Sequence, residues 1–183
     1  MRPLVLASQS PRRRELLTVA GIPFTVRVRP VEELRAAGES PDNYVRRLAR
    51  AKADASWENL DEVVLGADTV VVLDQEVLEK PRDAEDARRM LTMLSGREHI
   101  VITGICLRHM NGAEIDSVST TVRFLPLSAD EIDAYVASGE PMDKAGAYAI
   151  QGLASKFVES IDGCFFNVVG LPVSRVYRYL QTL

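Results

Sequence analysis

The sequence predicts a mixed α/β fold. Short apolar runs, typical of buried strands, alternate along the chain with segments whose apolar residues recur at helical spacing. A long hairpin over 99–124 interrupts this alternation and favours a sheet with antiparallel as well as parallel strands. The 183 residues suffice for one domain with a sizeable core, or for two lobes that share a cleft. Since the chain shows no repeat, linker or low-complexity tract, we expect a single domain over residues 1–183.

Serine and proline signals define the first elements. Residues 3–7, PLVLA, form a short apolar run that suits a buried strand. Ser10 can cap a helix and Pro11 fits its first position, so a helix is predicted to begin there. Residues 23–28 are expected to form a second strand. A second serine–proline start, followed by apolar residues at helical spacing, predicts a helix within 39–56.

The middle of the chain predicts strands around one helix. Residues 62–81 are expected to form a strand, a break at Gly66 to Asp68, and a second extended run. A helix over 83–96 should stop at its terminal glycine. The hairpin over 99–124 follows, and Asn111-Gly112 predicts a type I′ turn.

The last third opens with a clear helix signal. Ser128 and Glu131 form a capping box that predicts a helix over 128–138. Residues 139–152 are rich in glycine and small side chains and have no clean period. A strand over 156–161 and a closing helix over 171–183 complete the expected elements.

The charge balance and cysteine count exclude several classes of protein. The chain carries 22 Lys and Arg against 26 Asp and Glu, a net charge of -4, whereas a general nucleic-acid binder would normally be basic. Two cysteines without a CxxC pair favour buried thiols in a reducing cytosol. No run approaches the roughly 18 apolar residues of a membrane span. We therefore expect a cytoplasmic protein without nucleic-acid or membrane partners.

Missing motifs narrow the possible chemistry. Only His99 and His109 are present, which gives poor support to a catalytic triad or a histidine-rich metal site. The GxSxG, GxxxxGK[ST] and strand-following GxGxxG patterns are absent. If the chain is an enzyme, its base is expected to be a carboxylate, and its metal a hard cation with oxygen ligands.

Three arginines, Arg12 to Arg14, crowd the first turn of the first helix. This is the positive end of the helix dipole, where cations are unfavourable. A bound polyanion would explain them, because backbone N–H groups, the dipole and guanidinium groups would then act together on phosphate. Ser8 and Ser10 add hydroxyl groups nearby. The alternative is a solvated helix face whose arginines pair with Glu15 or other acids.

Asp68 and two lysines are further candidates. Asp68 follows an apolar run, at the expected end of a buried strand where ligands of α/β sheets collect, and Thr69 beside it can donate a hydrogen bond. The alternative for Asp68 is a turn that ends the strand. Lys52 lies at the edge of a helical apolar stripe and Lys80 precedes a proline. Each lysine can equally be a surface side chain whose stem covers apolar neighbours.

An irregular segment and a pair of acids complete the candidates. Residues 143–152 bring Asp143, Lys144, Tyr148 and Gln151 into a small-residue segment where the backbone could approach a flat ligand, or which could be a plain connection. Glu32 and Glu33 are loop acids whose default is a solvated surface. Together the cations and carboxylates predict a phosphorylated ligand and phosphoryl chemistry with a metal ion.

Several blocks, in this order and spacing, resemble the Maf family of nucleoside triphosphate pyrophosphatases. They are LASQSPRRRELL, RLARAKA, GADTVVVLDQEVLEKP, MLSGREHIVITG, EPMDKAGAYAIQG and NVVGLP. The resemblance implies a mixed α/β fold in two lobes around a deep cleft, similar to that of the inosine triphosphate pyrophosphatases. It also implies hydrolysis of a nucleotide between its α and β phosphates.

The family's motifs transfer to this chain residue by residue. They imply Asp68 as the proton acceptor, with Glu33 and Asp68 as expected ligands of a divalent Mg²⁺ or Mn²⁺; Glu32 leaves a one-residue ambiguity for Glu33. The expected substrate contacts are Ser8, Ser10, Arg12, Arg13, Lys52, Thr69, Lys80, Lys144 and Gln151. Among these, Arg12, Thr69 and Gln151 fall where the family sets base specificity. Arg14 lies outside the pattern and is expected on the surface.

The resemblance also implies a substrate class and a partner. The DKAGAYxIQG form is that of a branch that prefers dTTP and UTP, although Ala149 stands where glycine is expected and could narrow the pocket. The family suggests a homodimer. A different class of function, a non-catalytic nucleotide-binding regulator of cell division, is kept as the alternative.

Overall fold

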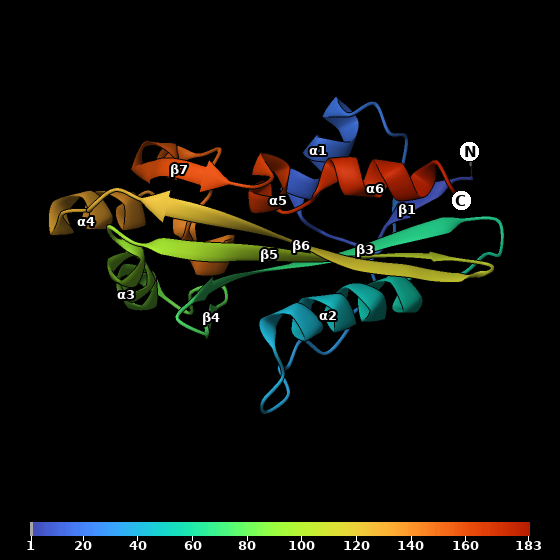
Figure 1. Ribbon diagram of the computed structural model, residues 1–183, viewed down its shortest axis with the longest axis horizontal. Helices are drawn as coiled ribbons and strands as arrows, with labels where there is room; N and C mark the ends of the chain where they lie inside the picture. The colour runs from blue at the N-terminus through green and yellow to red at the C-terminus, as the bar shows by residue number, and fades with distance from the viewer. Residues whose placement is uncertain (1) are drawn as a thin grey trace. The chain divides into compact units, whose positions relative to one another are not determined.

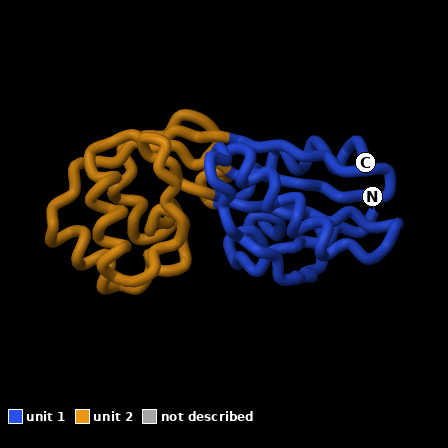
Figure 2. The backbone as a smooth tube through the Cα atoms, turned by 90° about the horizontal axis from the view of Figure 1, so that it is seen from below, with its two compact units in different colours: residues 1–69, 103–118, 170–183 blue, residues 70–102, 119–169 orange. Residues whose placement is uncertain are grey.

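The computed structural model describes residues 2–183 and divides into two compact units (Figure 2). Unit 1 comprises Met1–Thr69, Thr103–Val118 and Gly170–Leu183, and unit 2 comprises Val70–Ile102 and Ser119–Val169. Three long strands, β3 (Val63–Leu73), β5 (Glu98–His109) and β6 (Gly112–Phe124), supply residues to both units.

The strands form one mixed sheet in the order β2-β1-β3-β5-β6-β7, with β4 paired to β3. The remaining strands are β1 (Leu4–Leu6), β2 (Thr25–Val26), β4 (Glu76–Leu78) and β7 (Val158–Asp162). β1 runs parallel to β2 and β3, whereas β4 and β7 run antiparallel to their neighbours. The mixed α/β prediction is therefore confirmed, while the cleft between lobes stays a prediction.

Unit 1 places helices on both faces of its part of the sheet (Figure 1). α1 (Pro11–Val19) and α6 (Val173–Leu180) lie on one face, and α2 (Pro41–Ala55) lies on the other. The helix starts are as predicted, because Ser10 caps α1 and Ser40 caps α2 through their side chains. α6 is shorter than the helix expected over 171–183.

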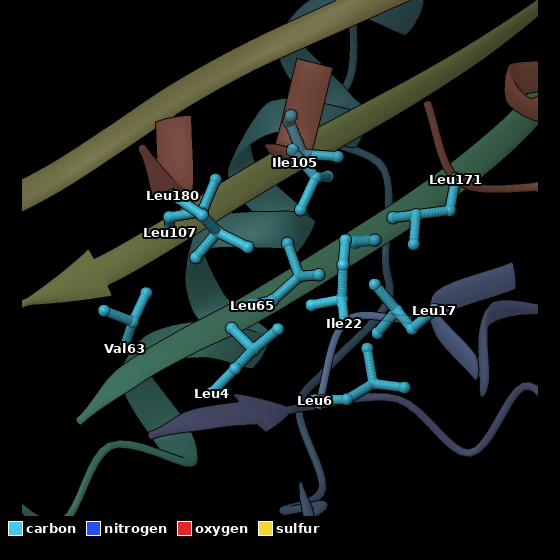
Figure 3. Close-up of a cluster of buried hydrophobic side chains, with 12 residues drawn as sticks. Leu4, Leu6, Leu17, Ile22, Val63, Leu65, Ile105, Leu107, Leu171 and Leu180 are labelled. Carbon is cyan, nitrogen blue, oxygen red and sulfur yellow. The ribbon is translucent and has the colours of Figure 1, made fainter. Parts of the chain in front are cut away.

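The core of unit 1 follows the two-residue period of its strands. One apolar cluster, drawn in Figure 3, joins alternate residues of β1, β3 and β5 to α1 and α6. The residues between them, such as Val5, Val64 and Cys106, pack with Ala49 and Ala53 of α2 instead. Alternation along a strand thus decides which helix each side chain meets.

The predicted break at Gly66 to Asp68 is wrong, because β3 continues through these residues. Gly66 serves the approach of α2: a Cβ built there would lie 2.0 Å from the backbone oxygen of Ala49. Gly104 in β5 does the same, since its Cβ would lie 2.4 Å from the backbone oxygen of Val45. Glycine in these strands therefore marks close helix packing and not a turn.

The hairpin over 99–124 is confirmed, but its predicted type I′ turn is wrong. β5 ends at His109 and β6 begins at Gly112, so the connection is Met110–Asn111 and Gly112 belongs to the strand. The positive φ angles that a type I′ turn needs at both central positions occur instead at Asp74 (48°) and Gln75 (72°), between β3 and β4.

Unit 2 contains α3 (Ala84–Leu94), α4 (Ala129–Ala137) and α5 (Phe165–Val169). The predicted capping box of α4 is present in full, whereas α5 was not predicted. The aperiodic segment after α4 contains two short 3₁₀ helices, η1 (Glu140–Asp143) and η2 (Ala145–Ala147), and a third, η3 (Leu153–Phe157), follows it. In the part of the chain that the structure describes, no helix is long and apolar enough to cross a membrane.

Candidate active site

Three charged side chains of unit 1 meet beside β3. The Lys52 ammonium on α2 lies 2.7 Å from Asp68 Oδ1 and 2.9 Å from Glu33 Oε1. Asp68 reaches α2 because it follows Gly66 by two positions and therefore points to the same face of β3. One cation thus holds together the two carboxylates that the resemblance implies as metal ligands.

Asp68 is a buried carboxylate with a perturbed pKa. Burial raises the pKa of its carboxyl above the ordinary value, and the positive charges of Lys52 and Arg13 oppose that rise. A carboxylate whose pKa is raised above its ordinary value is more basic and therefore better suited to accept a proton from water. The environment of Asp68 is therefore compatible with a general base.

Glu33 is held in its loop by side chains of α2. The Tyr44 hydroxyl donates to the backbone oxygen of Glu33 at 3.0 Å, and Arg47 Nη2 donates to that of Leu34 at 2.9 Å. The ion pair with Lys52 is made by Glu33. Between Glu32 and Glu33, the geometry therefore favours Glu33 as the acid of the site.

Arg13 occupies a second centre, on the α1 side of β3. Its side chain is buried, and Nε donates to the backbone oxygen of Gly170 at 2.8 Å. Nη1 donates to Ser8 Oγ at 3.0 Å and to the backbone oxygen of Ala67 at 2.9 Å, while Nη2 donates to Thr69 Oγ1 at 3.0 Å. Burial lowers the pKa of the guanidinium, and the charge of Asp68 opposes that change. Arg13 therefore joins Ser8 and Thr69, two other predicted site residues.

The other predicted residues of the first helix occupy its start. Ser10 accepts a hydrogen bond from the backbone N–H of Arg13 and so serves as the cap, and Arg12 is half-buried in the first turn. Arg14 is exposed, as expected for a residue outside the family pattern.

Lys80, Lys144 and Gln151 lie in unit 2. Lys80 is exposed and follows β4, and Gln151 is exposed before η3. Lys144 Nζ donates to the backbone oxygen of Glu140 at 2.6 Å and to Asp143 Oδ1 at 2.5 Å. The structure thus gathers most of the predicted residues of unit 1 into two groups, one around Lys52 and one around Arg13, and it places these three in the other unit.

The segment between Lys144 and Gln151 is fixed by buried contacts within unit 2. Tyr148 is buried and its hydroxyl lies 2.8 Å from His99 Nε2. Burial lowers the pKa of His99 to about 4, so the imidazole is neutral at pH 7. Gly146 (φ 67°) and Ala147 (φ 61°) both adopt left-handed backbone angles here. A non-glycine residue in that region is held by its surroundings, which here include the Tyr148 contact.

The sequence analysis missed Tyr44, Thr103 and Gly170. Thr103 is fully buried with its Oγ1 2.9 Å from Thr69 Oγ1, and Gly170 supplies a backbone oxygen to Arg13. Thr103 and Gly170 lie in the VITG and NVVGLP blocks that carry the resemblance, so those blocks were the available signal. Tyr44 had none, because its helical spacing predicts only a core residue.

The carboxylates fit a hard divalent cation only in part. Within residues 2–183, no group of three or more His, Cys, Asp or Glu side chains could hold a metal ion. Asp68 and Glu33 provide two oxygen donors that converge on one point, now shared with Lys52. Mg²⁺ commonly binds through one or two carboxylates together with substrate phosphates. The two carboxylates therefore fit a cation whose remaining ligands come from the phosphates of the substrate.

The family model and the similar sequences agree with one another. The family described as Maf-like protein matches residues 3–183. A protein of Vibrio cholerae named dTTP/UTP pyrophosphatase is 55% identical over 180 residues, covering 97% of this chain and 96% of its own. A protein of the same name from Koribacter versatilis is 51% identical over 179 residues, covering 97% and 93%.

Solved structures agree on the fold. A HAM1 protein from Coxiella burnetii matches with a TM-score of 0.53 and 17% identity, covering 100% of both chains. The Ham1 protein of Staphylococcus aureus matches with a TM-score of 0.52 and 11% identity, covering 99% of both. At these identities the likeness concerns the fold alone, and it agrees with the fold that the resemblance implies.

Proposed function

Since this chain belongs to the Maf family, we propose that it hydrolyses dTTP and UTP to the nucleoside monophosphate and pyrophosphate. The names of relatives about half identical over nearly the whole chain support this substrate class. They support an enzyme and give no support to the alternative, a regulator that only binds nucleotides. The family match covers residues of both units, so we propose that residues 1–183 act as one domain.

The observation that carries the proposal is the buried Asp68 carboxylate with its raised pKa beside Lys52. Attack of water on the α phosphorus requires that the water lose a proton, and Asp68 is the side chain suited to accept it. Lys52 keeps Asp68 oriented and places positive charge where negative charge develops on the phosphates. Pyrophosphate then leaves as the second product.

Asp68 and Glu33 would hold the divalent cation, Mg²⁺ or Mn²⁺. When bound, the cation supplies charge stabilisation to the triphosphate. Lys52, which contacts both carboxylates, would pair its ammonium with phosphate oxygens of the bound nucleotide. Ser8, Ser10 and Arg12, at the start of α1, are proposed to donate to phosphate, as a helix start with a basic first turn favours.

Lys80, Lys144 and Gln151 are proposed substrate contacts from unit 2, and Arg12, Thr69 and Gln151 are proposed to set the base preference. These roles rest on the resemblance of their motifs. A homodimer is proposed on the same ground, and a cytoplasmic location is proposed from the cysteine usage of the chain. Sedimentation of the purified chain at several concentrations tests the dimer.

A panel of nucleoside triphosphates tests the function. Each is assayed for released pyrophosphate with Mg²⁺, with Mn²⁺ and with neither. We expect dTTP and UTP to be the best substrates and the reaction to need a cation. Nucleotide binding without turnover across the panel would instead favour the regulatory alternative.

Asp68→Asn tests the proposed base. The amide cannot accept the proton, so kcat should fall by about 100-fold or more while the fold is kept. Steady-state rates with dTTP measure kcat, and circular dichroism shows whether the fold is kept. Asp54→Asn is the matched control, because Asp54 is an exposed carboxylate of unit 1 that pairs with Arg50 and Arg108. A folded Asp68→Asn protein as active as this control would remove Asp68 from the role.

A further inference from the structure

The contacts of Arg13 leave its guanidinium little capacity for a ligand. A guanidinium has five N–H donors, and four of them are directed at protein oxygens of Gly170, Ser8, Ala67 and Thr69. The residue is only 8% exposed. At most one N–H is left to meet a phosphate, whereas recognition of phosphate by arginine normally uses two parallel donors.

One of these bonds replaces a missing bond of the β1–β3 ladder. The last bond of the parallel ladder runs from the Ala7 N–H to the backbone oxygen of Leu65 at 2.8 Å. The next acceptor along that edge of β3 is the Ala67 oxygen, two residues on. The chain has by then left the sheet to begin α1, and Arg13 Nη1 supplies the donor at 2.9 Å. Arg13 therefore satisfies a β3 carbonyl that β1 no longer reaches.

Arg13 and Asp68 act from different sides of β3. Ala67 packs in the cluster of α1 and α6, so Thr69, two residues on, points to the same side and meets Arg13. Asp68, between them, points to the α2 side and meets Lys52. The Arg13 guanidinium thus binds the backbone oxygen of Ala67, the residue before Asp68, and the side-chain hydroxyl of Thr69, the residue after it.

We propose that Arg13 is a positioning residue that fixes the β3 backbone on both sides of Asp68, and that it is not a ligand of the triphosphate. This reassigns Arg13 from the phosphate contact that the family resemblance implies. The assignment rests on the proposed function, because it concerns how Asp68 is held for water attack. The proposed phosphate contacts at the start of α1 are then Arg12, Ser10 and the hydroxyl of Ser8, which precedes the helix.

The two roles predict different losses when Arg13 is changed. A phosphate ligand binds the intact nucleotide, so its loss weakens binding. A positioning residue sets the geometry of the reacting groups, and a displacement of about 1 Å there costs on the order of 100-fold in rate. The decisive comparison is therefore between kcat for dTTP and the Kd of a non-hydrolysable α,β-methylene analogue of dTTP.

Arg13→Lys and Arg13→Ala are measured with both assays in the presence of Mg²⁺. Lysine keeps the charge but cannot reproduce the forked set of donors. We expect kcat to fall about 100-fold in both variants, with analogue Kd within about threefold of the original protein. A Kd raised tenfold or more with kcat preserved at saturation would overturn the inference.

Two neighbours on the same helix calibrate the measurement. Arg14→Ala removes an exposed cation one residue away and should leave kcat, KM and analogue Kd unchanged. Arg12→Ala should raise the analogue Kd, which shows that the assay detects a lost ligand contact. If Arg13→Ala does not fold, Arg13→Lys decides; if neither folds, Arg13 serves the stability of the chain and the inference is wrong. An original protein that releases no pyrophosphate would overturn the proposed function itself, which no result on Arg13 alone would do.

Discussion

At the scale of single residues, the position of Glu33 depends on Tyr44. Tyr44 is buried within α2, and its hydroxyl is the donor that holds the backbone oxygen of Glu33 at 3.0 Å. The Glu33 side chain is half exposed, so its ion pair with Lys52 alone gives it weak restraint. The loop is therefore held through its backbone, and Tyr44 in this way supports Glu33, the proposed cation ligand.

Tyr44→Phe removes only this hydroxyl. We expect a loss of about 1 kcal/mol in the free energy of unfolding and a rise of about 10-fold in the Mg²⁺ concentration needed for half-maximal activity, because the support of a proposed ligand is gone. Urea unfolding and an Mg²⁺ titration of the rate measure these changes, and calorimetric titration with Mn²⁺ gives affinity without turnover. Tyr177→Phe, on the exposed face of α6, is the control. Equal cation requirements in the two variants would contradict the role of Tyr44.

At the scale of elements, α2 is the helix that builds the site. Its residues include Tyr44, which holds the Glu33 loop, and Lys52, which meets Asp68. α2 can reach Asp68 because Gly66 and Gly104 let its backbone lie directly against β3 and β5. The distance between helix and sheet, set by two missing side chains, therefore determines the geometry of the charged group.

Gly66→Ala should separate α2 from the sheet. Its Cβ would lie 2.0 Å from the Ala49 oxygen, which belongs to the helix backbone and cannot rotate away. We expect a loss of about 3 kcal/mol or more in the free energy of unfolding, together with lost activity. Urea unfolding measures the first. Gly112→Ala is the control: no described atom lies within 4 Å of its Cβ, so it adds only the strain of its φ of 144° and should cost about 1 kcal/mol. Equal losses in the two variants would show that close packing is not the cause.

Elements with local signals could be predicted, and contacts between distant residues could not. The caps at Ser10, Ser40 and Ser128 act within three residues, so the sequence shows them directly. The break predicted at Gly66 is wrong because a glycine needed for close packing and a glycine needed for a turn cannot be told apart in a single sequence. Whether such a glycine is covered by a helix depends on residues elsewhere in the chain.

The candidate site follows the same division. The identity of Asp68, Lys52 and Glu33 could be predicted from motifs, and the structure places them within contact. The burial of Arg13 could not, because its partners Ala67 and Gly170 are 54 and 157 positions away and contribute only backbone oxygens. Every residue has a backbone oxygen, so the sequence does not indicate which of them accepts such a hydrogen bond.

At the scale of the whole molecule, paired carboxylates link folding to pH. Burial alone would raise the pKa of Glu62, but hydrogen bonds from Arg27 and from the N–H groups of Glu58 and Asn59 bring it to about 2. A hydrogen bond from Arg47 likewise lowers the pKa of Glu39 to about 2. Both groups take up a proton more readily when unfolded. Their stabilisation is therefore complete above a pH of about 4.5 and is lost as the pH falls toward 2.

Glu62→Gln should weaken this acid dependence. The variant should lose on the order of 2 kcal/mol of unfolding free energy at pH 6, because several donors lose a charged acceptor. The difference from the original protein should shrink as pH falls from 4.5 to 2, where Glu62 becomes protonated in both folded and unfolded chains. Urea unfolding across this range measures it. Glu159→Gln, at an exposed pair with Arg123, should cost at most about 0.5 kcal/mol. A constant deficit for Glu62→Gln at every pH would contradict the assignment.

The bond between Arg13 and Gly170 also has a consequence for the order in which the protein is made. Arg13 leaves the ribosome 157 positions before its acceptor Gly170, which is followed by helix α6. At about 5 to 20 residues per second, the guanidinium waits roughly 8 to 30 s for the last of its oxygen partners. During that time the guanidinium lacks the Gly170 acceptor that it has in the folded protein. The contacts that hold the backbone beside Asp68 are therefore complete only after Gly170 has been synthesised, so a nascent chain cannot acquire the arrangement proposed for catalysis before that point.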